Sequence, residues 1–163
     1  MTEPRVEQMP LPSEYGEPTK KLAWPEVRAE LERAPTYWVA SVRPDGRPHV
    51  VPKDGVWLDD VWYYGGGETT VHHRNLHHNP EVAVHIGDGM KATIVEGRVQ
   101  RIVPPRETAE RLAAATNEKY AHYGMNNTAE MYDSGIWALR PRRVLAWNLL
   151  YEDATRFTFG VDA

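Results

Sequence analysis

Residues 37–84 have the sequence YWVASVRPDGRPHVVPKDGVWLDDVWYYGGGETTVHHRNLHHNPEVAV, and this stretch decides the fold. It opens with Tyr37–Val42, which is rich in the aromatic and β-branched residues that favour strands. Pro44–Gly46 predicts a tight turn, because proline presets the first turn dihedral and glycine accepts a positive φ. A return strand begins at His49. Within it, Pro52 is expected at a bulge or a sheet edge, because proline has no N–H to donate. The stretch therefore begins with a β-hairpin.

The second half of the stretch predicts a strand, a short helix and another strand. Val61–Tyr64 forms the third strand, and three glycines, Gly65–Gly67, end it. A short helix is expected over Glu68–Leu76, capped by a threonine and ended before Asn79-Pro80. Glu81–Ile86 then alternates apolar and polar residues as a half-buried strand does.

Outside this stretch, the same patterns predict further helices and strands. Helices are expected from Trp24 to Ala34 and from Arg106 to Tyr123, and strands over Ala92–Ile102 with a kink or bulge at Gly97, Ile136–Pro141, Val144–Trp147 and Thr155–Phe159. This gives six or seven strands and two or three helices. Tight turns join most neighbouring strands, so the sheet is expected to be largely antiparallel and to close or half-close into a barrel. The expected fold class is mainly β (α+β).

Composition narrows the class of protein. A chain of 163 residues predicts one domain. A net charge of −4 gives no overall basic character for nucleic acid, and no apolar run is long enough to predict a membrane span. Without cysteine there are no disulfides, thiol nucleophiles or thiolate metal sites, and a cytoplasmic location is expected. Residues 1–20 are polar and proline-rich without a signal peptide's apolar core, which predicts a flexible arm before a domain over residues 21–163.

Four histidines crowd the predicted helix: His72, His73, His77 and His78. His73 and His77 are four residues apart, the spacing of a helical two-histidine metal site, but the sequence places no third ligand beside them. A helix N-terminus with threonines and basic side chains also suits an anion such as phosphate. A solvated, weakly basic helix is the third interpretation. The anion site fits these residues better than the metal site.

The glycine run matches neither a dinucleotide-binding nor a Walker motif. It follows a strand and precedes a helix, so it is either a flexible turn or a place where the backbone approaches a phosphate. The sequence has no serine elbow and no pair of acids at motif spacing, so a hydrolase has little support.

Five segments in order resemble one known group. They are Ser41–Pro52, Arg74–Leu76 with Asn79-Pro80, Val95–Gly97, Leu139–Val144, and Thr155–Phe157 with Phe159. From about Tyr37 to Phe159 the chain resembles the pyridoxamine 5'-phosphate oxidase-like superfamily of flavin-binding split β-barrels. Within it, the chain looks closest to the deazaflavin (coenzyme F-420)-dependent reductases.

This resemblance implies a homodimer with two cofactor sites at the interface. The flavin or deazaflavin ring would lie along the second and third strands, and the cofactor phosphate at the short helix. Carried over by position, the cofactor-binding residues are Arg47, His49, Val50, Val51, Pro52, Tyr64, Thr69, Thr70, His72, Arg74, Asn75, Trp147 and Arg156. Trp147 and Arg156 would approach from the partner subunit or close the site.

The chain departs from the family pattern in its basic residues. His72 stands where the family usually has a lysine, and histidine is mostly neutral at pH 7. Lys53 lies one residue from the position of a phosphate-contacting lysine in the oxidase branch, so no role is assigned to it. These departures argue against a true pyridoxamine phosphate oxidase.

The function expected from the resemblance is oxidoreduction with coenzyme F-420 or FMN, by hydride transfer to or from a small organic substrate. The cofactor would carry the chemistry while the protein supplies position and electrostatics. No acid or base is assigned, and Tyr64, His49 and Arg156 are candidates. Two alternatives stay open: a non-catalytic flavin, haem or tetrapyrrole binding protein of the same fold, and a metal-binding or structural dimer.

Overall fold

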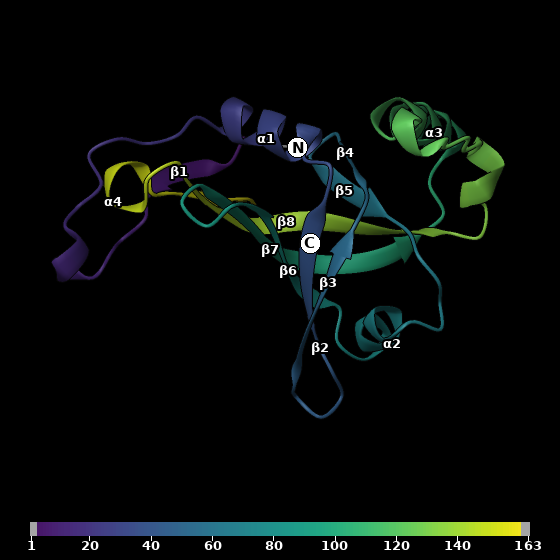
Figure 1. Ribbon diagram of the computed structural model, residues 1–163, viewed down its shortest axis with the longest axis horizontal. Helices are drawn as coiled ribbons and strands as arrows, with labels where there is room; N and C mark the ends of the chain where they lie inside the picture. Colours follow the sequence, from purple (N-terminus) through teal and green to yellow (C-terminus); the bar gives the residue numbers. More distant parts are fainter. Residues whose placement is uncertain (1–2, 161–163) are drawn as a thin grey trace.

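The computed structural model describes residues 3–160, so Met1, Thr2 and the last three residues lie outside it. Figure 1 shows the arrangement of its elements. The strands are β1 Arg5–Gln8, β2 Tyr37–Val42, β3 Pro48–Lys53, β4 Val56–Leu58, β5 Val61–Tyr64, β6 Glu81–Gly87, β7 Ala92–Ile102, β8 Ile136–Trp147 and β9 Thr155–Thr158. The α-helices are α1 Trp24–Arg33, α2 Val71–His78, α3 Arg106–Lys119 and α4 Leu150–Asp153, and the 3₁₀ helices are η1 Ser13–Tyr15, η2 Ala121–Tyr123 and η3 Ala129–Tyr132.

The strands form one antiparallel sheet in the order β1-β9-β8-β7-β6-β2-β3, with β4 and β5 attached through β8. β8 pairs with β7 along nearly its whole length, its first part also with β5 and its last part with β9. The long strand β8 thus connects β5 at its start and β9 at its end to the rest of the sheet. The fold is a split β-barrel with flanking helices, and the expected fold class is confirmed.

Two apolar clusters lie on different sides of the sheet. The larger one fills the barrel and packs α1 against it through Trp24, Val27 and Leu31. The smaller one joins β4, β5 and the start of β8 to α3 and η3, through residues such as Tyr63 and Leu112. In Figure 1, α3 lies above the right-hand end of the sheet and α2 lies below it.

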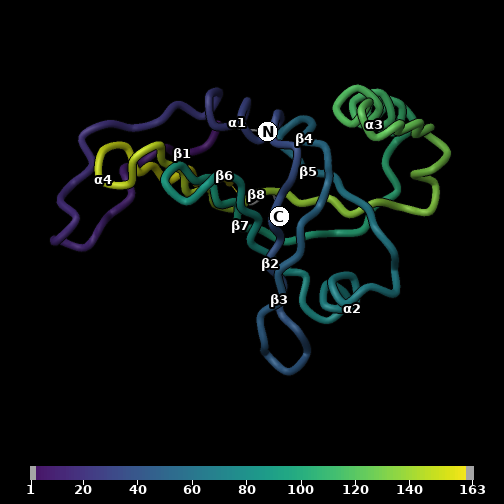
Figure 2. The backbone as a smooth tube through the Cα atoms, in the orientation of Figure 1, coloured from purple at the N-terminus to yellow at the C-terminus, as the bar shows by residue number. Residues whose placement is uncertain are grey.

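The stretch 37–84 folds largely as its sequence predicts. β2 and β3 form a hairpin that protrudes from the body, as the tube in Figure 2 shows, and Pro52 lies on β3 at the end of the sheet order. α2 begins at Val71 rather than Glu68, because the Thr70 side chain caps it by accepting from His73 N, and it ends before Asn79-Pro80. The predicted irregularity in β7 is a shift of register between Glu96 and Gly97.

The prediction of a flexible arm over residues 1–20 is wrong for part of the segment. Arg5–Gln8 forms β1, which pairs with β9, and the backbone N–H groups of Thr19 and Lys20 donate to the Glu152 carbonyl oxygen. The prolines of this segment flank β1 rather than interrupt it, so its ladder keeps its donors. Met1 and Thr2, also part of the predicted arm, lie outside the described residues.

The count of strands also differs from the prediction. Residues 3–160 contain nine strands rather than six or seven, and four α-helices rather than two or three. The predicted strands Ile136–Pro141 and Val144–Trp147 are one strand, because Pro141 lies opposite the irregularity at Gly97. At that position the missing N–H of proline removes no regular ladder bond.

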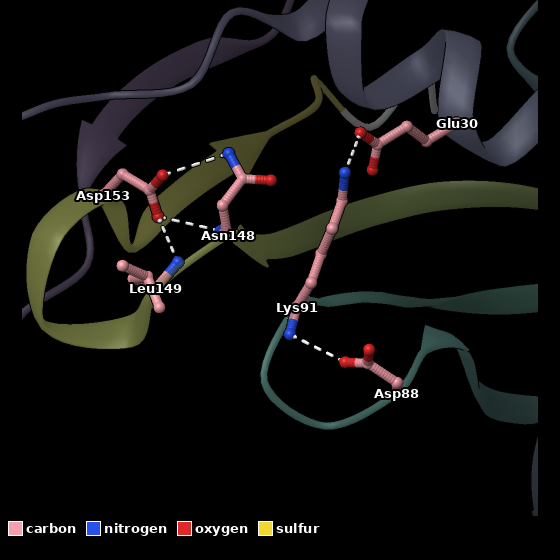
Figure 3. A network of polar contacts seen from close by, with 6 residues as sticks. All are labelled: Glu30, Asp88, Lys91, Asn148, Leu149 and Asp153. Carbon is pink, nitrogen blue, oxygen red and sulfur yellow. Dashed lines mark hydrogen bonds and ion pairs between the residues drawn. The ribbon is translucent and has the colours of Figure 1, made fainter.

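A buried carboxylate organises the turn between β8 and β9. Asp153 accepts from Asn148 N at 2.8 Å, from Asn148 Nδ2 at 3.1 Å and from Leu149 N at 3.1 Å (Figure 3). We call Asn148, Leu149 and Asp153 the Asp153 corner. In the same view, Lys91 of the β6–β7 turn pairs with Glu30 of α1. These polar contacts fix the end of the sheet opposite α2.

Candidate functional site

A cavity of about 510 Å³ opens between the sheet and the α3–η3 side of the molecule. Its walls come from the β3–β4 connection, β5 and the glycine run, and from α3, η3 and the start of β8. The aromatic side chains lining it are Tyr63, Tyr64, Tyr120, Tyr132 and Trp137. A cavity of this size holds a small organic molecule.

Two buried histidines lie where α2 meets the glycine run. His72 Nε2 is 3.1 Å from the Tyr64 hydroxyl oxygen, and His73 Nδ1 is 2.8 Å from the Gly67 carbonyl oxygen. The second ring nitrogen of each, His72 Nδ1 and His73 Nε2, is buried without a hydrogen-bond partner within residues 3–160. Buried polar atoms are normally paired, so these two mark a place where a ligand atom is expected.

Burial keeps both rings neutral. Desolvation, reinforced by the charge of Lys53, lowers the pKa of His72 to about 4 and also lowers the pKa of His73. The rings can therefore donate or accept a hydrogen bond at pH 7 but bring no positive charge to the site.

Lys53 supplies the positive charge that the histidines lack. Its Nζ donates to the Gly65 carbonyl oxygen at 3.3 Å, and burial lowers its pKa. A Cβ built on Gly66 would lie 2.5 Å from Lys53 Nζ and 2.9 Å from His73 Cε1. We call Lys53, Gly65–Gly67, His72 and His73 the histidine corner. Among these glycines only Gly66 makes this close approach, and its φ of +140° favours glycine, so a larger residue there would be strained and would displace the end of the Lys53 side chain.

Strand alternation divides the predicted β3 residues between two faces. His49 lies opposite Ser41 of β2, and Val51 lies opposite Val39. Ser41 accepts from Asn75 Nδ2 of α2 at 3.1 Å, so this face is turned toward α2. Val50 and Pro52 project from the opposite face, because successive side chains alternate along a strand.

The remaining predicted residues of the short helix and the hairpin have different surroundings. Thr69 and Arg74 are exposed, while Thr70 caps α2. Asn75 is buried against Ser41. Arg47 lies at the hairpin turn and pairs with Asp45 at 2.7 Å, away from the histidine corner.

Trp147 and Arg156 lie across the sheet from α2. Arg156 belongs to β9, which β8, β7, β6 and β2 separate from β3 in the sheet order. Its guanidinium donates to Glu7 of β1 at 3.1 Å. Trp147 ends β8 opposite Ala92. Within one chain, the structure does not bring either residue to the histidine corner.

His73 and His77, the pair with metal-site spacing, differ in their exposure to solvent. His73 is buried, whereas the exposed His77 lies 3.5 Å from a Glu68 carboxylate oxygen. Among residues 3–160, no group of three or more histidine, cysteine or acidic side chains is placed to hold a metal ion.

Sequence reasoning assigned no role to Lys53, and of the cavity lining it singled out only Tyr64 and the glycine run. A signal for Lys53 was available: His49, Val51 and Lys53 alternate along one strand, so all three share the face turned toward α2. The cavity wall contributed by α3 and η3 had no comparable signal, because its residues come from segments far apart in the sequence.

Comparison with known proteins decides the family. A family model for pyridoxamine 5'-phosphate oxidase matches residues 23–148. The chain belongs to this family. That membership confirms the resemblance seen in the sequence. No curated protein matches the chain.

Solved structures of similar fold carry several different names. An F420 reductase is 26% identical with a TM-score of 0.56, covering 72% of this chain and 94% of that one. A conserved hypothetical protein from Mycobacterium tuberculosis is 20% identical with a TM-score of 0.63, covering 79% and 89%. A heme binding protein from Mycobacterium smegmatis is 20% identical with a TM-score of 0.63, covering 92% and 60%. No described helix is long and apolar enough to cross a membrane.

Proposed function

We propose that this chain is an oxidoreductase that uses coenzyme F-420 or FMN to transfer a hydride to or from a small organic substrate. The observation that carries the proposal is the histidine corner: half-buried Lys53 and the glycine run line the cavity wall, and two buried histidines, each with an unpartnered ring nitrogen, lie against the glycine run. Membership of the pyridoxamine 5'-phosphate oxidase family and similarity to an F420 reductase support it.

The residues present fit a flavin-type cofactor with an anionic tail. Lys53 provides the charge for a phosphate, and the glycine run lets the backbone approach it. His72 Nδ1 and His73 Nε2 each offer one hydrogen bond to a bound group. When bound, the cofactor supplies the hydride chemistry. The protein's part is to hold the tail, to orient the ring and to exclude water through the aromatic wall of the cavity.

We further propose that the functional unit is a homodimer formed through the outer face of the sheet. The side chains of Trp38, His85, Ile94 and Leu145 follow one another across β2, β6, β7 and β8 on one face. Trp38 is 48% exposed, and the nearby Val50 is 56% exposed. Neighbouring apolar side chains exposed on a sheet face mark an interaction surface.

In such a dimer, the same face would bring Trp147 and Arg156 toward a cofactor bound by the partner. Arg156 lies opposite Leu145 on β9, and Trp147 is two residues beyond Leu145 on β8, so both side chains project from this face. A second copy packed against the face would receive both residues. Size-exclusion chromatography with light scattering tests the dimer, and a monomer at micromolar concentration would contradict it.

Direct titration tests the cofactor. Purified protein is mixed with coenzyme F-420 or FMN, and binding is followed by the change in cofactor fluorescence. We expect one of the two to bind with a dissociation constant in the micromolar range or below. Absence of binding to both would remove the proposal.

A second candidate is a non-catalytic haem-binding protein of the same fold. Its specific support is the pair of buried ring nitrogens without partners, since imidazole is a common haem ligand. One solved structure of similar fold is named a heme binding protein. A Soret band after addition of haem, lost on His73→Ala substitution, would favour this candidate.

A further inference from the structure

An ion pair spans the wall of the cavity. Arg101 of β7 contacts the Glu68 carboxylate, and its second guanidinium nitrogen donates to the Ser134 carbonyl oxygen at 2.8 Å. All three residues line the cavity. The Arg101 side chain is 32% exposed and that of Glu68 is 50% exposed, so a molecule entering from solvent can reach the pair.

Glu68 neutralises the cavity from within. The charged side chains of the lining are two basic ones, Lys53 and Arg101, and two acidic ones, Asp54 and Glu68. The lining is therefore neutral while Glu68 is in place. Without the Glu68 carboxylate it carries one net positive charge. Glu68 thus acts as a built-in counterion for Arg101.

The Glu68 side chain can leave Arg101 without disturbing its backbone. The preceding residue is anchored, because the Gly67 carbonyl oxygen accepts from Thr70 N at 3.0 Å and lies 2.8 Å from His73 Nδ1. The second Glu68 carboxylate oxygen already lies 3.5 Å from His77 Nε2, which offers another position outside the pair. Exposed ion pairs are weak, so an incoming anion displaces one readily.

We propose that Arg101 is the anion-recognition residue of this cavity and that Glu68 competes with the ligand for it. The cavity then selects a small planar molecule that carries a carboxylate or phosphate. The guanidinium binds that group in a two-pronged geometry, and the tyrosine-rich wall packs against the ring. The inference rests on the proposed function, because it assumes that the cavity binds the cofactor or the substrate of the reaction. The acidic group belongs either to a separate substrate or to the tail of the cofactor.

Binding of benzoate and of benzamide tests the competition, because the two molecules have nearly the same shape and differ in charge. Affinities are measured by titration of the cofactor-free protein, followed through the backbone amide NMR signals of Gly65, Gly66 and Gly135. We expect Glu68→Gln to bind benzoate about threefold to fivefold more tightly than the wild type, as release of an exposed ion pair implies, with benzamide unchanged. We expect Arg101→Gln to bind both molecules equally.

Glu130→Gln is the matched control. Glu130 of η3 pairs with Arg106 of α3 at 2.7 Å on the protein surface and does not line the cavity, so both affinities are expected to stay at the wild-type values. Equal benzoate affinity in the wild type and Glu68→Gln would overturn the inference, as would absence of benzoate binding in every variant. The gain expected for Glu68→Gln cannot arise from misfolding.

Comparing FMN with riboflavin separates the two sources of the anion. If Arg101→Gln weakens FMN more than riboflavin, the recognised anion is the cofactor phosphate. If Arg101→Gln leaves the ratio of the FMN and riboflavin affinities unchanged but abolishes the preference for benzoate over benzamide, the anion belongs to a second ligand. A protein that binds benzoate through Arg101 but neither FMN nor coenzyme F-420 would overturn the proposed function and leave this inference standing.

Discussion

The Asp153 corner and the histidine corner both bury polar side chains, but they differ in how well those side chains are bonded. The Asp153 carboxylate accepts three N–H donors from two neighbouring residues. In the histidine corner, one nitrogen of each ring lacks a partner within the described residues. Buried polar groups that are fully bonded stabilise a fold, whereas unpaired ones destabilise it. The first corner therefore stabilises the fold, and the second is the one for which we propose a binding role.

The largest expected effect is on the Asp153 corner. Asp153→Ala removes the acceptor for three N–H groups, and we expect the free energy of unfolding to fall by about 3 kcal/mol. Urea denaturation followed by tryptophan fluorescence measures it. Glu152→Ala is the matched control: its carboxylate pairs with exposed Lys20, so a change below about 1 kcal/mol is expected. Equal effects at the two positions would break the comparison.

The next largest effect is on the pH dependence of the free energy of unfolding, to which His72 of the histidine corner contributes. The folded pKa of His72 is lowered to about 4, below the unfolded value of about 6.5. The unfolded state therefore takes up the proton first, so stability is full above pH 6.5 and is lost as the pH falls toward 4. We expect His72 to lower the free energy of unfolding by about 2 kcal/mol between pH 7 and pH 5. A His72→Phe variant should lose much of this slope in denaturation curves, and an unchanged slope would contradict the assignment.

Lys53 should affect cofactor binding more than stability. Lys53→Met keeps most of the unbranched side chain but removes its charge, and we expect the affinity for FMN to fall about tenfold with riboflavin little changed. Fluorescence titration of both cofactors measures the difference. Lys21→Met, at an exposed position, is the control and should change neither affinity. A parallel loss of both affinities would mean that Lys53 does not contact a phosphate.

The smallest effect concerns Thr70, which the resemblance assigned to the cofactor phosphate. The structure gives it a capping role, with His73 N donating to its hydroxyl oxygen at 3.4 Å. We expect Thr70→Ala to lower the free energy of unfolding by about 1 kcal/mol, measured by denaturation. Thr70→Asn restores a capping side chain and should recover most of that loss. A drop in FMN affinity that Thr70→Asn does not restore would add a ligand contact to the cap.

Much of the fold was predictable because its signals are local. The Pro44–Gly46 turn and a threonine cap each depend on residues adjacent in sequence. The turn appears where it was predicted, and the cap is Thr70, although the helix begins at Val71 rather than Glu68. β1 was not predictable in the same way. Its partner is β9, about 150 residues away, and the composition of a short polar segment does not reveal a distant strand. For the candidate site, the sequence pointed to α2, which contributes His72 and His73 to the histidine corner, but it assigned no role to Lys53.

The sequence by itself determined the hairpin, the capped helix, the antiparallel class of sheet and the family. The first three follow from residue type and short spacing, which act through backbone dihedrals and nearby hydrogen bonds, whereas the family follows from the resemblance of five segments to a known group. Only the tertiary structure decided which polar atoms are left unpaired, which face of β3 meets α2, and that Arg101 meets Glu68 at the cavity. Those facts depend on burial and on pairing between segments far apart in the chain, and such segments become neighbours only when the sheet is assembled.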